Sequence, residues 1–132
     1  MKEKELIEQA LKARERAYAP YSKFAVGAAL LTKNGRIYLG CNIESASFSP
    51  TCCAERVAFF SAVSNQEREF SAIAIVGGNI DNKKLKLCSP CGVCRQVMSG
   101  FCSRDFKVIL SDGAEDVKIY TLDELLPLSF TM

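Results

Sequence analysis

The segment that most restricts the fold is FAVGAALLT, at residues 24–32. Its apolar side chains occupy both alternating sets of positions, which predicts a strand that is covered on both faces. The segment SAIAIVGG, at residues 71–78, reads as a second buried strand. Strands of this kind require a sheet that carries helices on each side, and this requirement limits the possible architectures.

The connections indicate how the other strands are arranged. Asn34-Gly35 predicts a two-residue hairpin between strand 24–32 and an antiparallel partner at 36–44. Four residues separate strands 106–112 and 117–122, too few for a parallel crossover, so this pair is expected to be antiparallel.

Helical periodicity marks the remaining elements. The expected helices cover residues 3–18, 52–65 and 90–102, with a short one after the capping box of Thr121 and Glu124. The element order is therefore α-β-β-α-β-α-β-β with a helical tail. It predicts an α/β fold, a three-layer α-β-α sandwich with a mixed five-stranded sheet, as a single domain over residues 1–132.

Composition restricts the possible partners. The net charge of the 132 residues is only +2, and no clustered basic face is evident, so nucleic acid is not an expected partner. No apolar run is long enough to span a membrane. The N-terminus lacks the apolar core of a signal peptide, so we expect a cytoplasmic protein with reduced thiols.

The chain contains seven cysteines and no histidine. An odd cysteine count in a reducing compartment disfavours a disulfide framework. The absence of histidine excludes Ser-His-Asp and Cys-His mechanisms built within this chain. Any zinc site must therefore use cysteine or carboxylate ligands.

The stretch CSPCGVC places Cys91 and Cys94 three residues apart at the start of a predicted helix, where Pro90 suits the entry. Both sulfurs then lie on one helix face and can reach one ion. A redox dithiol or two core cysteines would give the same pattern. A ferredoxin cluster would need a further cysteine where the chain has Met98, so that alternative fails.

Upstream, CCAE opens another predicted helix and contains Cys53 and Glu55. If Cys53 joins Cys91 and Cys94, three protein ligands leave a fourth tetrahedral position open, as is typical of catalytic zinc. Glu55 would then lie near the metal without binding it. This arrangement matches the pattern described for zinc deaminases.

The motifs PYSKFAVGAALLT, GCNIE, CAER, PCGVCRQV and DELLP together resemble the small homotetrameric zinc-dependent cytidine deaminases. The resemblance covers nearly the whole chain. It implies hydrolytic deamination of cytidine and deoxycytidine to uridine and deoxyuridine, with release of ammonia. CAE and PCGVCRQ alone would also fit the related blasticidin S deaminases.

The resemblance also implies roles for individual residues. Zinc would be held by Cys53, Cys91 and Cys94, and Glu55 would carry protons. The substrate-binding residues would be Phe24, Asn42, Glu44, the backbone of Ala54, and Phe130, which would reach the site of a neighbouring subunit. Where the family commonly has tyrosine this chain has Phe48, so a hydroxyl contact is absent there.

Several of these residues also have ordinary structural interpretations. Phe24 could be a core residue, Asn42 and Glu44 could cap a loop, and Phe130 could belong to a frayed tail. Asn42 and Glu44 occupy alternate positions of a predicted strand end and should share a face, which suits a sugar contact.

The charge of the predicted zinc site suggests a role for Arg56. Zinc with three thiolates carries a net negative charge, which would weaken its ability to acidify water. Arg56 directly follows Glu55 and could donate hydrogen bonds to the thiolates, withdrawing charge from sulfur. Alternatively, Arg56 could be an ordinary surface residue of the predicted helix.

Two other functions remain to be compared with the nucleoside deaminase. One is a deaminase acting on RNA or DNA, which the low charge and the short GAED loop disfavour. The other is a structural zinc module closed by Cys52 or Cys88 as a fourth ligand, in which Glu55 would have no purpose. Cys41, Cys52 and Cys102 are expected to be small buried or bystander residues, and the spacing of Cys88 to be a coincidence.

Overall fold

The computed structural model describes residues 3–81, 85–113 and 115–131, and within these ranges five strands form one sheet in the order β2-β1-β3-β4-β5. The strands are β1 (Phe24–Thr32), β2 (Ile37–Cys41), β3 (Phe70–Asn79), β4 (Lys107–Ser111) and β5 (Val117–Thr121). Only β3 and β4 pair in parallel. The predicted mixed five-stranded sheet is confirmed, with β1 and β3 inside it as their apolar sequences require.

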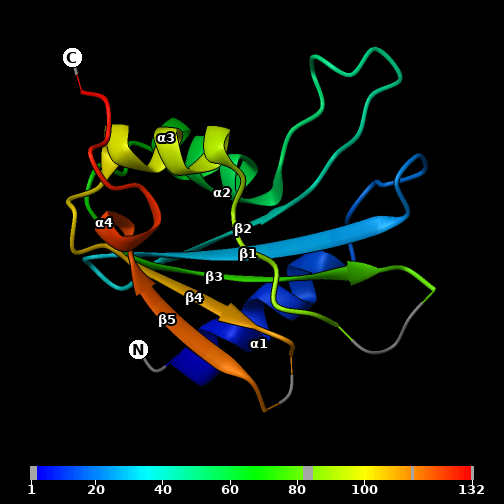
Figure 1. The fold of residues 1–132 in the computed structure, drawn as a ribbon, viewed down its shortest axis with the longest axis horizontal. Coiled ribbons are helices and arrows are strands. Elements are labelled where there is room, and N and C mark those ends of the chain that lie inside the picture. The colour runs from blue at the N-terminus through cyan, green and yellow to red at the C-terminus, as the bar shows by residue number, and fades with distance from the viewer. Residues whose placement is uncertain (1–2, 82–84, 114, 132) are drawn as a thin grey trace.

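Helices cover both faces of this sheet, as Figure 1 shows. The helix α1 (Glu3–Arg14) packs on one face, whereas α2 (Ala54–Ser64) and α3 (Gly92–Phe101) pack on the other. A short α4 (Leu122–Leu125) follows β5 and carries the predicted capping box of Thr121 and Glu124. Each side of the sheet thus has its own apolar core, and the three-layer architecture is confirmed.

Two glycines let the helices approach the sheet closely. A Cβ atom at Gly27 would lie 2.1 Å from the carbonyl oxygen of Ala10 in α1, and one at Gly40 would lie 2.2 Å from that of Ala54 in α2. These distances are far below van der Waals contact, so any larger residue would push the helix away. The Gly40 contact concerns the site directly, because it fixes the first turn of α2.

The end of the first helix and the length of the first hairpin loop differ from the prediction. The first helix ends at Arg14, not at residue 18, because the backbone of Tyr18 pairs instead with Asn42 and Glu44. The hairpin loop between β1 and β2 is longer than two residues: Thr32 N–H donates to the carbonyl of Arg36, and Gly35 has a φ of +90°. This is a three-residue hairpin whose last loop residue adopts the left-handed conformation.

Residue 114 of the GAED segment, which is predicted to join the last two strands, lies outside the described residues, as do residues 82–84. Within the described ranges, none of the helices has the length and apolar character needed to traverse a bilayer.

Candidate active site

The helices α2 and α3 begin close together on the same side of the sheet. Cys53 is the N-cap residue of α2 and Cys91 is the N-cap residue of α3, and both have extended backbone conformations. The prediction placed Cys91 inside the first turn; it lies one residue earlier, and its sulfur accepts from the backbone N–H of Cys94. The partial positive charge of the two helix N-termini therefore acts on the same small volume.

Three cysteine sulfurs meet at this point. The Sγ atoms of Cys53 and Cys91 are 3.8 Å apart, those of Cys91 and Cys94 are 3.5 Å apart, and all three lie within 4.8 Å of one another. A tetrahedral zinc ion with bonds of about 2.3 Å to sulfur would separate its thiolate ligands by about 3.8 Å. The donor set and its spacing therefore fit zinc.

The other cysteines do not join this group. Among the described residues, neither Cys52 nor Cys88 belongs to the set of donors that could share one ion. Both instead line the adjoining cleft, while Cys41 is half-buried and Cys102 packs against the core. The three-sulfur set thus leaves a fourth tetrahedral position, which a closed structural site would fill.

Glu55 lies in the first turn of α2, two residues after Cys53, and only 5% of its surface is exposed. Burial raises the pKa of this carboxyl from its ordinary value to about 7, since desolvation disfavours the charged form. A carboxyl with a pKa in this range can both accept and donate a proton near neutral pH.

Arg56 Nη2 donates to the sulfur of Cys53 over 3.3 Å. Hydrogen bonds from Cys94 and then from Arg56 lower the pKa of Cys53, and the bond to Cys53 raises the pKa of Arg56 in turn. The Nε atom of Arg56 is buried and has no hydrogen-bond partner among the described residues. A partly buried cation that donates to one of the sulfurs fits a cluster that carries excess negative charge.

A cleft of about 240 Å³ opens beside the sulfurs and Glu55. Two of the predicted sugar-binding residues, Asn42 and Glu44, lie in its wall. They lie beyond the end of β2, not within a strand. The side chain of Asn42 accepts from Val26 N–H at 2.9 Å and donates to the carbonyl of Phe24 at 2.7 Å.

Glu44 is held by the loop that follows α1. Its Oε1 atom accepts from the backbone N–H groups of Tyr21 and Ser22, and its other oxygen accepts from the Ser22 hydroxyl. The hydrogen bond from the Ser22 side chain is the main cause that lowers the pKa of Glu44. Glu44 is therefore a fixed anion at the rim of the cleft.

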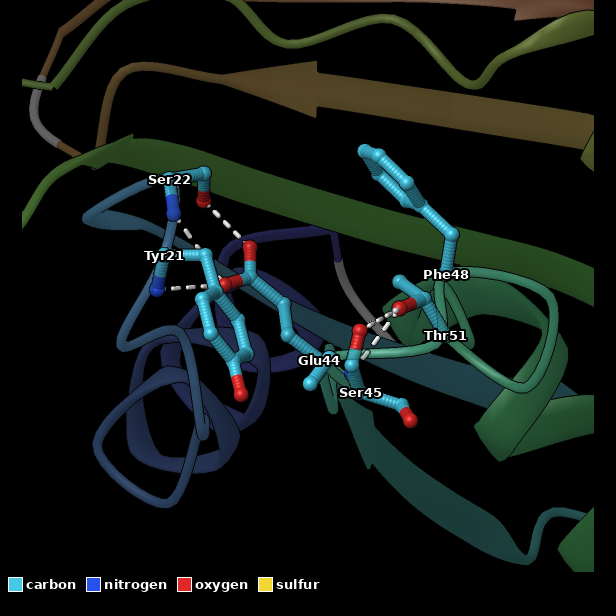
Figure 2. A pocket seen from close by; sticks show the side chains of 7 residues that line it. Tyr21, Ser22, Glu44, Ser45, Phe48 and Thr51 are labelled. Atoms are coloured by element: carbon cyan, nitrogen blue, oxygen red, sulfur yellow. Dashed lines mark hydrogen bonds between the residues drawn. The ribbon is translucent and has the colours of Figure 1, made fainter.

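A second cavity of about 330 Å³ adjoins the first, since Glu44 and Thr51 line both. Figure 2 shows the Glu44 carboxylate turned toward Tyr21 and Ser22, and Thr51 beside Ser45, whose backbone N–H donates to the Thr51 hydroxyl. Phe48 extends from the same loop with 85% of its surface exposed.

The remaining predicted residues are placed differently. Ala54 lines the cleft, at the first position of α2. Phe24 stands at the start of β1 with 37% of its surface exposed, near the cleft's Val26 but not among its lining residues. Phe130 is 69% exposed and lies in the C-terminal segment, where its carbonyl accepts from Gln96.

A sequence model of the cytidine and deoxycytidylate deaminase zinc-binding region matches residues 1–110. The chain belongs to this family. It is 49% identical to a cytidine deaminase of Sporosarcina psychrophila over 96% of this chain and 89% of that protein. A cytidine deaminase of Halalkalibacterium halodurans is 50% identical over 96% of this chain and 92% of its own length.

The fold agrees with that assignment. The crystal structure of a cytidine deaminase from Burkholderia pseudomallei superposes with a TM-score of 0.89 at 45% identity, covering 98% of this chain and all of that one. As a member of the cytidine and deoxycytidylate deaminase family, the chain has a zinc-binding region, and Cys53, Cys91 and Cys94 are arranged in it as zinc ligands are expected to be.

Several residues of this deaminase's cleft were missed by the sequence analysis: Val26, Thr51, Cys52, Cys88 and Ser89. Val26 could have been found, because it shares a strand face with Phe24. The sequence predicts Cys52 and Cys88 to be bystanders to the metal. They are outside the three-sulfur group, but they form part of the cleft wall.

Proposed function

We propose that the protein is a zinc-dependent deaminase that hydrolyses cytidine and deoxycytidine to uridine and deoxyuridine, with release of ammonia. One observation carries the proposal: three cysteine sulfurs spaced for one zinc ion lie beside a buried glutamate at the wall of a cleft. The similarity to proteins named cytidine deaminase supports the choice of substrate.

In this proposal Cys53, Cys91 and Cys94 hold the zinc, and Arg56 offsets part of the thiolate charge. When bound, the metal supplies Lewis acidity, which lowers the pKa of a water from roughly 16 to roughly 7. The fourth position that the three sulfurs leave is where this chemistry would be available.

Glu55 then moves the protons. It takes a proton from the attacking water and delivers it to N3 of cytosine while the water oxygen bonds to C4. It then takes the proton of the hydroxyl now bonded to C4 and passes it to the exocyclic amino group, so that the C4–N4 bond breaks, a C4 carbonyl forms and ammonia leaves. The pKa of about 7 supports this role, because the same group must act first as a base and then as an acid.

The cleft supports roles for the other predicted residues. Asn42 and Glu44 would bind the ribose hydroxyls, and each keeps hydrogen-bonding capacity beyond its internal bonds. The backbone of Ala54 would contact the pyrimidine edge, and Phe24 would pack near the sugar and base. Phe48, where the family commonly has tyrosine, contributes no hydroxyl.

We further propose that the chain, as a single domain over residues 1–132, acts as a cytoplasmic homotetramer in which sites are shared. The exposed rings of Phe48 and Phe130 are compatible with this arrangement, since neither is buried within its own chain. Phe130 would complete the site of a neighbouring subunit.

The test is an ultraviolet deamination assay on cytidine, deoxycytidine, CMP and blasticidin S, with metal content measured on the same sample. We expect about one zinc per chain and turnover of both nucleosides, with CMP left unchanged because an anionic Glu44 lines the cleft. Turnover of blasticidin S alone would replace the proposed substrate, and a zinc-loaded protein inactive on all four would refute the proposal.

A further inference from the structure

The side chain of Arg95 joins two distant pieces of backbone. It leaves α3 one residue after Cys94, and its Nε atom donates to the carbonyl of Pro90 at 2.8 Å. Its Nη1 atom donates to the carbonyl of Leu125, at the end of α4, also at 2.8 Å. Both bonds are partly buried, so water competes poorly for these carbonyls.

The bond to Pro90 bears on the metal ligand that follows it. Proline has no backbone N–H, so its carbonyl is the only backbone polar group through which this residue can be held. That carbonyl belongs to the peptide plane that precedes Cys91. The backbone N–H of Arg95 meanwhile donates to the carbonyl of Cys91 at 2.9 Å.

Arg95 therefore holds both peptide planes that flank Cys91. Together these planes set the φ and ψ of Cys91 and thus the direction of its Cα–Cβ bond, from which the sulfur extends. This matters because the three sulfurs are not equally supported by packing: Cys94 is 1% exposed, whereas Cys91 is exposed. The position of the Cys91 sulfur depends on its backbone more than on its surroundings.

The bond to Leu125 gives this arrangement a fixed support. The last carbonyls of a helix have no partner within it, and Arg95 satisfies one of them at the end of α4. A guanidinium can donate in two directions at once from a rigid plane, which a lysine ammonium on a flexible stem cannot reproduce.

We propose that Arg95 is a positioning residue for the metal site: it fixes Cys91 through Pro90 and is itself anchored on the C-terminal helix. The inference rests on the proposed metal role of the three cysteines but not on the identity of the substrate. Its consequence is that Arg95 slows the release of zinc without touching the metal.

The experiment measures zinc release from the zinc-loaded protein into excess chromogenic chelator, with no substrate present. We expect Arg95→Ala to release zinc at least about tenfold faster, within the range found when groups that orient metal ligands are removed. Gln96→Ala is the matched control: it changes the next residue of α3, whose side chain bonds Ser99 and the carbonyl of Phe130 but not Pro90. Its release rate should equal that of the wild type.

A second control separates positioning from general loss of stability. Phe101→Leu weakens the packing of α3 against Phe59 without affecting Pro90, so it lowers the melting temperature through the core. The rate of zinc release from each variant is measured at the same number of degrees below its own melting temperature. Under these conditions Arg95→Ala must release zinc faster than Phe101→Leu. Arg95→Lys keeps one donor and should fall between Arg95→Ala and the wild type, which preserves the test if Arg95→Ala does not fold.

Each outcome is decisive. If Arg95→Lys released zinc at the wild-type rate, a positive charge would suffice, and the inference would be overturned. It would also be overturned if Gln96→Ala released zinc as fast as Arg95→Ala. A wild-type rate of zinc release from Arg95→Ala would overturn it as well. A wild-type protein that holds no zinc would instead refute the proposed function.

Discussion

Arg56 Nη2 lies 3.3 Å from the sulfur of Cys53, three residues earlier at the start of α2. Positions three residues apart lie on one face of a helix, so the helix itself holds the cation against the thiolate. Zinc with three thiolates would carry about one negative charge, and this contact lowers the electron density on one of the sulfurs.

Removal of this contact should weaken the metal site. We expect Arg56→Ala to keep some zinc but to bind it about 10- to 100-fold more weakly and to lose activity, measured by chelator competition and by kcat. Arg104→Ala removes a distant, exposed arginine and should change neither quantity. Wild-type affinity and activity in Arg56→Ala would exclude the proposed role.

The substitution Glu55→Gln should separate metal binding from catalysis. The amide has the size of the carboxyl but cannot exchange protons, so we expect normal zinc content and a kcat at least about 100-fold lower. Glu8→Gln, on the exposed side of α1, should have normal kcat. Near-normal turnover in Glu55→Gln would contradict the assignment of the proton carrier.

Zinc content should distinguish ligands from neighbours. We expect Cys88→Ala to retain about one zinc per chain, because Cys88 lines the cleft outside the three-sulfur group. Cys53→Ala should lose the metal. Elemental analysis after dialysis measures both, and the opposite pattern would show that the ligand set is wrong.

Mixed oligomers can test whether Phe130 completes a neighbouring site. Glu55→Gln retains the aromatic ring but has an inactive site, whereas Phe130→Ala has an intact Glu55 but lacks the ring. Co-expression of the two chains should give activity well above the sum of the separate variants. If the mixture is no more active than that sum, Phe130 acts within its own subunit or not at all.

The pH response of Glu44 should depend on Ser22. Because the Ser22 hydrogen bond lowers its pKa below the ordinary 4.5, the ionised carboxylate stabilises the fold above pH 4.5. That contribution is lost as the pH falls through the lowered pKa. An NMR titration of the zinc-free protein should show the Glu44 pKa rising in Ser22→Ala.

The matched reference for this titration is Asp105, whose pKa is lowered by a hydrogen bond from Ser103. Its pKa should be the same in the wild type and in Ser22→Ala. An unchanged Glu44 pKa in Ser22→Ala would show that the hydroxyl is not its main partner.

The architecture was predictable because it depends on local patterns. Apolar residues on both faces of segment 24–32 required covering helices, and the box of Thr121 and Glu124 marked the last helix. The hairpin at Gly35 was predicted one residue too short, since the Asn-Gly pair occurs in loops of more than one length.

The site was predictable only in part, because its walls depend on distances between segments remote in sequence. The spacing of Cys91 and Cys94 could be read along the chain, but their approach to Cys53 could only be expected from the family pattern. The partner of Glu44 was not foreseen, because Ser22 is 22 residues away in a loop whose course no local pattern determines. The cleft positions of Cys52 and Cys88 were missed for the same reason.

Cys53 and Cys91 are 38 residues apart, and the segment between them contains α2 and the central strand β3. A metal ion bound to both closes this loop in the folded chain, so it acts as a reversible cross-link whose binding free energy adds to the stability of the fold. Loss of zinc would then loosen two helix starts at once, while α1, on the opposite side of the sheet, is not attached to the cross-link. Hydrogen exchange in the metal-free chain would accordingly divide the molecule by layer and not by position in the sequence.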